Sequence, residues 1–226
     1  MQAHHSVHAS ALALASARRL TRPRLSLRSR AVVIAGCAVL LGQLGHAQSV
    51  EYPHPAIDVV VYDYANVPAA QLRRAKKELI GIYRTIGIDI TWQEVSTLTF
   101  PSATESLTAS TIGRARFVFI KPSRIASTHD RANIAGSAYG VDGCGRVAYV
   151  FYDRVKALPV EMLGYVIAHE LGHLLLPAGH SPQGLMRASW DMADLQRAQT
   201  GWLLFTREQA EAIRARSSEI ARASSR

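Results

Sequence analysis

An apolar stretch that leads into two histidines four residues apart is the feature that most constrains how this chain folds. Residues 160–168 are apolar at helical spacing, which predicts a buried helix. On that helix His169 and His173 project from one face, so both imidazoles can reach a single ion. Glu170 follows the first histidine, where a carboxylate can act on a water without binding the ion itself. Pro177 cannot continue the helix, so the helix is predicted to end before it.

A third histidine follows the helix break. Gly179 permits a sharp turn, and such a turn can bring His180 back towards the two helical imidazoles. Three protein ligands and one open position are the catalytic arrangement of zinc, so the sequence predicts one catalytic Zn2+ ion. Two alternatives stay open at this stage. Either Asp191 or Asp194 supplies the third ligand in place of His180, or the histidines are core and surface residues that bind no metal.

These residues together resemble the signature of the metzincin zinc metallopeptidases, most closely of their matrixin-like and archaemetzincin-like branches. That family carries H-E-x-x-H-x-x-G-x-x-H, followed by a turn that holds a methionine beneath the metal. The chain offers counterparts of the family's three ligands, its glutamate and its methionine: His169, His173, His180, Glu170 and Met186. It departs from the pattern at two points, since Leu176 occupies the glycine position and the third histidine comes one residue late. A methionine beside a leucine is also common as core filler, which is the alternative for Met186.

The resemblance implies a fold and an activity. The implied fold is an α+β zincin domain, in which a small twisted mixed sheet carries a backing helix, an active-site helix and a C-terminal helix. The implied activity is that of a secreted zinc-dependent endopeptidase, with Glu170 as general base and a peptide or protein as substrate. In metzincin-like folds an extended substrate lies along the edge strand of the sheet. By that resemblance Ser137, Ala138 and Tyr139 bind a peptide through their backbone; a plain edge strand is the alternative.

Local patterns predict the remaining elements. Runs rich in β-branched and aromatic residues predict strands at 57–63, 88–95 and 115–120, and a β-hairpin from 135–139 and 146–152. An amphipathic pattern predicts a helix over 68–86, and Gly87 is expected to end it. Ser189 is expected to cap a short helix that begins there. Thr206 and Gln209 have capping-box spacing before a final helix.

The first 47 residues differ in composition from the rest of the chain. They contain six arginines and no acidic residue, then an apolar run over 31–44 and a small-x-small site at 45–47. This order predicts a secretory signal peptide that is cleaved near Ala47 and Gln48, so the product is secreted or periplasmic. Cys37 follows a lipobox-like sequence, but the apolar run continues beyond it, which favours secretion over a lipid anchor. The expected mature part, residues 48–226, has the length of one domain.

Charge and cysteine content narrow the partners. The chain has 26 basic and 17 acidic residues, a net charge of +9, and removal of the six N-terminal arginines leaves +3. The mature part is therefore not basic enough to indicate nucleic-acid binding. The apolar run is shorter than the roughly 20 residues of a membrane-spanning helix, so no stable membrane span is expected in the mature form. Cys144 is the single cysteine after residue 47, so no intrachain disulfide is expected, and a turn thiol is the favoured interpretation.

Two other functions are compatible with the same motif. One is a secreted, non-catalytic binding protein on a zincin fold, in which zinc has a structural role. Glu170 weighs against it, because a structural site does not need a carboxylate at that position. The other is a zinc hydrolase of non-peptide substrates, since the metal and the base serve either reaction.

Overall fold

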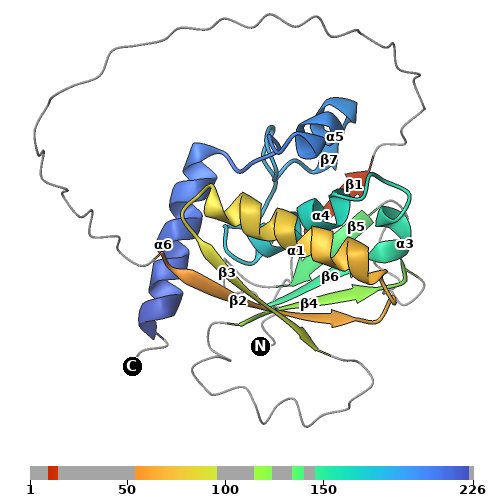
Figure 1. Cartoon of the computed structure of the whole chain (residues 1–226). Helices are drawn as coiled ribbons and strands as arrows, with labels where there is room; N and C mark the ends of the chain where they lie inside the picture. The colour runs from red at the N-terminus through yellow and green to blue at the C-terminus, as the bar shows by residue number, and fades with distance from the viewer. Residues whose placement is uncertain (1–9, 15–53, 96–114, 124–133, 140–145, 224–226) are drawn as a thin grey trace, which may run out of the picture. The chain divides into compact units, whose positions relative to one another are not determined.

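A mixed β-sheet forms from the segments richest in Val, Ile, Phe and Tyr (Figure 1). The computed structural model describes residues 10–14, 54–95, 115–123, 134–139 and 146–223, all of which belong to one compact unit. Within these residues the strand order is β3-β2-β4-β6-β5-β1-β7. The strands are β1 (Ser10–Leu14), β2 (Ala56–Asp63), β3 (Asp89–Val95), β4 (Arg116–Lys121), β5 (Ile134–Tyr139), β6 (Val147–Phe151) and β7 (Ser189–Trp190).

Parallel pairing dominates one half of the sheet and antiparallel pairing begins at β5. Strand β2 pairs in parallel with both β3 and β4, and β4 pairs in parallel with β6. Strands β5 and β6 pair antiparallel, which confirms the predicted hairpin. Strand β1 then pairs antiparallel with β5 and parallel with β7. In the whole chain β5 is therefore not an edge strand; among residues 54–223 its outer side faces no other strand that the structure describes.

Helices cover one face of this sheet and complete an α+β fold, as the sequence predicts. They are α1 (Ala69–Arg84), α3 (Tyr152–Val155), α4 (Met162–His173), α5 (Met192–Gln199) and α6 (Arg207–Ala223). Helix α1 turns its apolar residues inwards at helical spacing, and Gly87 follows its end with a φ of 69°. Helix α4 is buried over almost its whole length, as its apolar sequence predicts. No helix in the described part of the chain has the length and apolarity of a membrane span.

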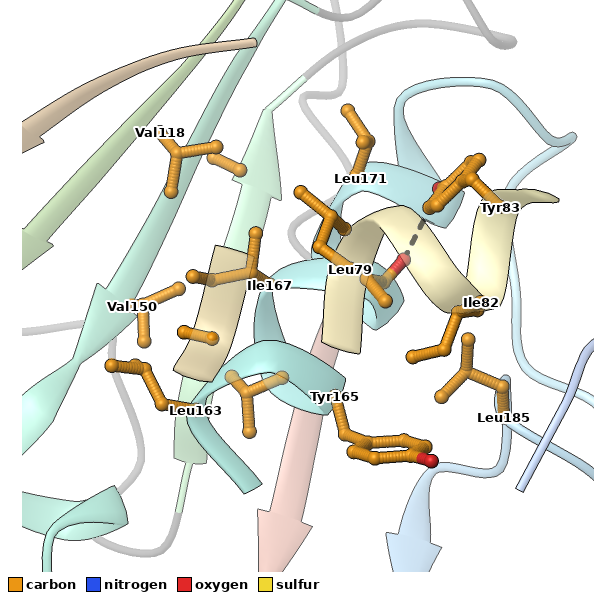
Figure 2. Close-up of a cluster of buried hydrophobic side chains, with 14 of the residues drawn as sticks. Leu79, Ile82, Tyr83, Val118, Val150, Leu163, Tyr165, Ile167, Leu171 and Leu185 are labelled. Carbon is orange, nitrogen blue, oxygen red and sulfur yellow. Dashed lines mark hydrogen bonds between the residues drawn. The ribbon is translucent and has the colours of Figure 1, made fainter. Parts of the chain in front are cut away.

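The packing of α1 against α4 sets the position of the histidine motif. Figure 2 shows Leu79, Ile82 and Tyr83 of α1 facing apolar side chains of α4 and the sheet. The two helices approach closely at Gly164, where a Cβ atom would lie 2.8 Å from the carbonyl oxygen of Ala75. One turn further on, the buried Tyr83 hydroxyl donates a hydrogen bond of 3.3 Å to the carbonyl oxygen of Ala168. Helix α4 is thus fixed along its length immediately before the first histidine.

The structure corrects one predicted helix start and confirms another. Ser189 does not cap a helix: it lies in β7, and α5 begins at Met192 with Asp191 as its N-cap. Asp191 and Asp194 form a capping box there, because each side chain accepts a hydrogen bond from the other residue's backbone N–H. At the start of α6 the predicted capping box of Thr206 and Gln209 is present. Cys37, Cys144 and the predicted cleavage site lie outside the described residues.

Candidate metal centre

Helix α4 brings two imidazoles together at its C-terminal end. His169 and His173 are one turn apart, and their Nε2 atoms are 3.0 Å from each other. Their rings meet edge-on, with centroids 4.7 Å apart. His169 is fully buried, while His173 is partly exposed. The helix therefore holds one ligand candidate inside the protein and presents the next one towards solvent.

The third imidazole arrives from the loop that follows α4. Gly179 has a φ of 117°, which an L-residue rarely adopts, and the chain turns there as the sequence predicts. The turn places Nε2 of His180 at 3.2 Å from Nε2 of His173. One nitrogen of each of the three histidines lies within 4.8 Å of those of the other two. The structure therefore brings all three sequence-predicted ligands to one point.

The geometry of the cluster fits a zinc ion. A tetrahedral site with Zn–N bonds of about 2.0–2.1 Å separates its ligand nitrogens by about 3.3 Å. The two Nε2–Nε2 distances, 3.0 and 3.2 Å, are close to that value. His169 is also held in the tautomer that a ligand needs, because its Nδ1 donates a 2.8 Å hydrogen bond to the Leu185 carbonyl oxygen. In neutral His169 the lone pair on Nε2 consequently faces the other two imidazoles.

Burial keeps these histidines in the neutral form that binds metal. It lowers the pKa of His169 to about 3, against the opposing effect of the hydrogen bond to Leu185. Burial likewise lowers the pKa of His173 to about 2, helped by the neighbouring His169 and His180. The pKa of His180 is also lowered, again by burial. Metal binding at neutral pH therefore does not have to displace protons from these three rings.

Glu170 is buried beside the cluster with no hydrogen-bond partner for its carboxylate. Its side chain is fully buried, and neither carboxylate oxygen has a partner among the described residues. Burial raises its pKa well above the ordinary value for a glutamate. The carboxylate lies against Gly136 in the middle of β5, where a Cβ atom would come within 2.6 Å of its Oε1. An unpaired buried carboxyl group is costly, and such groups in native proteins commonly have a catalytic role or an unrecorded water or ion.

Met186 lies under the end of α4. It is 1% exposed, and its Sδ would be 2.6 Å from a Cβ atom built on Gly172. The methionine therefore packs directly on the helix backbone next to His173. Trp190 covers the other side of the cluster, with its ring edge-on to that of His169 at 5.7 Å. Its indole N–H shares the Leu185 carbonyl oxygen at 3.2 Å.

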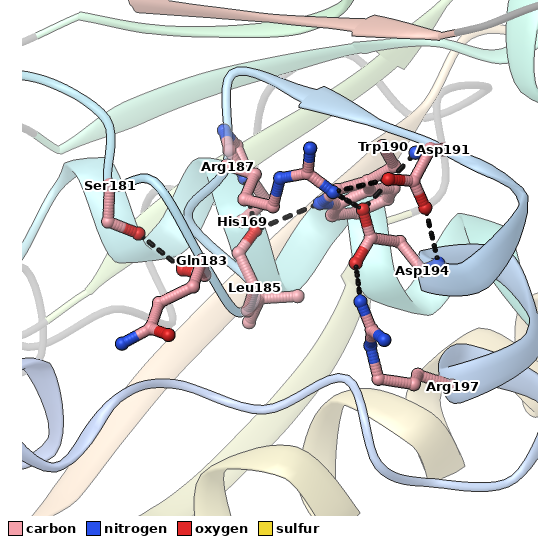
Figure 3. A network of polar contacts seen from close by, with 9 residues as sticks. All are labelled: His169, Ser181, Gln183, Leu185, Arg187, Trp190, Asp191, Asp194 and Arg197. Atoms are coloured by element: carbon pink, nitrogen blue, oxygen red, sulfur yellow. Dashed lines mark hydrogen bonds and ion pairs between the residues drawn. The ribbon is translucent and has the colours of Figure 1, made fainter.

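A charged network holds the segment between the third histidine and α5 (Figure 3). The fully buried carboxylate of Asp194 is paired with Arg187 and, at 2.9 Å, with Arg197. Asp191 is paired with Arg187 at 2.9 Å. Both aspartates are thus engaged with arginines and with the cap of α5, and neither belongs to the group of residues that could hold a metal ion. This arrangement favours His180 over the two aspartates as the third ligand.

Three elements of the site have weak sequence signals or none. The carbonyl of Leu185 orients His169 through a backbone atom, and no side-chain pattern announces it. Gly136 and Gly172 are required by close approach of Glu170 and Met186, and a glycine inside a strand or helix is the only signal of that. The predicted peptide-binding residues, Ser137–Tyr139, follow Gly136 directly in β5. They therefore lie on the strand that contacts the buried glutamate.

The fold and the site define an α+β protein with a three-histidine candidate metal centre beside a buried glutamate. No protein-family model matches the sequence, and no match was found among curated proteins. Among solved structures the chain is similar to archaemetzincin from Methanopyrus kandleri, with a TM-score of 0.46, 14% identity and coverage of 75% of this chain and 99% of that one. It is also similar to metalloproteinase-II from Bacteroides fragilis, with a TM-score of 0.45 and 13% identity. That match covers 76% of this chain but 55% of the metalloproteinase. Because both TM-scores lie below 0.5, the function proposed below is based on the site.

Proposed function

We propose that this chain is an exported zinc-dependent hydrolase that cleaves peptide bonds. The observation that carries the proposal is the buried, unpartnered carboxylate of Glu170 next to three converging imidazoles. A structural zinc site is closed by four protein ligands and has no use for such a carboxylate. Three histidine ligands leave one position open, which is the arrangement of a catalytic site.

His169, His173 and His180 would hold the ion. When bound, zinc lowers the pKa of water and polarises a carbonyl group, and both effects promote hydrolysis. The protein contributes the orientation of the ligands. The Leu185 carbonyl fixes the His169 ring, and the packing of Met186 on Gly172 fixes the helix backbone beside His173.

Glu170 would carry the proton transfers. As a general base it takes a proton from the attacking water, and as a general acid it passes that proton to the leaving amine. Burial raises its pKa towards neutrality, where one group serves well in both directions. Its contact with Gly136 fixes the carboxylate against β5, so the base and the strand that would carry a substrate stay in register.

A polypeptide is the substrate class that the neighbouring strand favours. Strand β5 runs past Glu170, and its outer side pairs with another extended segment, β1. Main-chain pairing of this kind binds an extended peptide through its repeating N–H and C=O groups. An exported enzyme would meet such substrates outside the cytoplasm, in agreement with the signal peptide predicted for residues 1–47.

The test compares wild type with Glu170→Gln, using residues 48–226 and a broad peptide library. Loss of the base should lower cleavage about 10²- to 10⁴-fold while one zinc per chain is retained. Glu211→Gln is the matched control, because Glu211 is an exposed glutamate on α6 that pairs with Arg207. It should cleave like wild type. Equal cleavage by Glu170→Gln and wild type would contradict the proposal. Hydrolysis of esters but of no peptide would keep the metal chemistry and reject the peptide substrate.

A further inference from the structure

A segment from the N-terminal region lies inside the sheet next to the candidate site. Strand β1, residues 10–14, pairs antiparallel with β5 and parallel with β7. It thereby fills the space between the strand that contacts Glu170 and the strand that carries Trp190. Helix α4 contacts β1 as well. Among the described residues, the two-residue strand β7 pairs only with β1.

The register places the middle of β1 over the metal centre. Ala11 pairs with Ser137 and Ala13 with Ile134, and the register shifts between Ala11 and Ala13. The two pairs flank Gly136, the position on β5 that contacts the carboxylate of Glu170. The backbone of β1 is therefore irregular opposite the candidate base.

The other side of β1 is fixed next to a ligand. Leu14 pairs with Trp190, whose ring packs on the imidazole of His169. One end of the segment is consequently aligned with the wall that holds a ligand, and its centre is aligned with the wall that holds the base.

The domain does not need β1 for its core. All the buried core residues in the described part of the chain lie between Ile57 and Ile213, and the partly buried ones packed against them end at Ile220. The core is thus complete within the part that remains after the predicted removal of residues 1–47. The contribution of β1 is backbone pairing along β5 and β7, which a removable segment can supply.

We propose that residues 10–14 act as an intramolecular plug, which occupies the peptide-binding slot in the uncleaved chain and keeps the centre closed until the N-terminal region is removed. This inference rests on the proposed function, since it takes the slot between β5 and β7 to be the place of a peptide substrate. Covalent attachment favours the plug, because a tethered segment has an effective concentration of about millimolar or higher at its site. Release requires the hydrolysis of one peptide bond, with one water consumed and a new carboxylate and amine formed.

Hydrogen exchange of the full chain tests the plug without reference to activity. In Ala11→Pro the ring removes one N–H and the strand geometry that pairs with β5. The β5 amides that point away from β6, and those of β7, should then exchange at least ten times faster than in wild type. Residues 48–226 should show the same acceleration. Ala3→Pro, which lies outside the paired segment, is the control and should exchange like wild type. The amides of β2 and β4 should not change in any variant, which shows that the domain stays folded. Equal exchange in all chains would overturn the proposal.

A second measurement separates the plug from the peptidase claim. A synthetic peptide of residues 8–16 is titrated into residues 48–226 that carry Glu170→Gln, so that it cannot be consumed. It should bind and restore protection to β5, while the same peptide with proline at its Ala11 position should bind at least ten times more weakly. In cleavage assays residues 48–226 and full-length Ala11→Pro should be at least ten times more active than the full-length wild type. Altered exchange with no cleavage by any chain would reject the proposed function and keep the plug. Cleavage by the short chain with unaltered exchange would reject the plug and keep the function.

Discussion

Gly136→Ala places a methyl group against the candidate general base and leaves the histidines untouched. The new Cβ would lie 2.6 Å from Oε1, 2.7 Å from Cγ and 2.8 Å from Cδ of Glu170. Ordinary contacts between such atoms are about 3.5–4.0 Å, so the carboxylate has to move by about 1 Å. A displacement of about 1 Å at a reacting group costs about 10²-fold in rate. Overpacking of this buried position should also lower the free energy of unfolding by about 1–3 kcal/mol.

The assay for Gly136→Ala combines peptide cleavage, zinc content and urea unfolding on one preparation. Gly81→Ala is the matched control, because the exposed Gly81 of α1 has no atom within 4 Å of its added Cβ. Alanine is a better helix former than glycine, so the control should gain about 0.5–1 kcal/mol and cleave like wild type. The expected result for Gly136→Ala is one zinc per chain and about 1% of wild-type cleavage. Full activity in a folded, zinc-loaded Gly136→Ala chain would refute the role given to the position of Glu170.

Three further predictions concern stability. Tyr83→Phe removes the hydrogen bond to Ala168 and should cost about 1 kcal/mol in urea unfolding with zinc content unchanged; a loss of zinc would contradict the view that it only anchors the helix. Asp194→Ala leaves two partly exposed arginines without their buried partner, so it should cost about 2 kcal/mol and weaken zinc binding in a competition with a chelator; unaltered affinity would show that the network does not position the third histidine. In the metal-free chain, the two α4 histidines have pKa values of about 3 and about 2 when folded, below the unfolded value of about 6.5. Their contribution to stability is therefore complete above about pH 6.5 and is lost as the pH falls towards 3. The raised pKa of Glu170 acts in the opposite sense, because its contribution is lost as the pH rises above the unfolded value. A Glu170→Gln background isolates the histidines, and its urea midpoint should fall between pH 7 and 4.5; a flat profile would contradict the depressed values.

Local sequence patterns were sufficient wherever one segment determines its own structure. The run of valines in 59–61 forms β2, and the apolar residues of α1 and α4 recur at the spacing that buries one face or the whole helix. The spacing of His169 and His173 fixes two ligand candidates on one helix face. The break at Pro177 and the turn at Gly179 indicate how a third one can return.

Prediction failed where distant segments decide. Ser189 and Asp191 are both good N-cap residues, and the sequence alone gives no reason to prefer the second. Pairing of Ser189 and Trp190 with β1 extends the chain there and delays the helix to Met192. Strand β1 could not be predicted either, because residues 10–14 lie within an expected export signal and pair only with segments far along the chain.

Backbone contacts at the site were equally out of reach. The Leu185 carbonyl orients His169 whatever the side chain at position 185 is. Gly136 and Gly172 stand out in hindsight as glycines inside regular elements, but their partners, Glu170 and Met186, follow only from the packing of α4. The ligand set was thus predictable from local spacing, and its environment was not.

The coordination of zinc tests the central claim most directly. Zinc K-edge X-ray absorption on the loaded chain counts imidazole nitrogens and measures their distances from the ion. We predict three nitrogens at about 2.0–2.1 Å and one light atom at the open position in wild type, with two nitrogens left in His180→Ala. The same spectrum in wild type and His180→Ala, or a loss of one ligand in Asp191→Ala instead, would contradict the three-histidine centre.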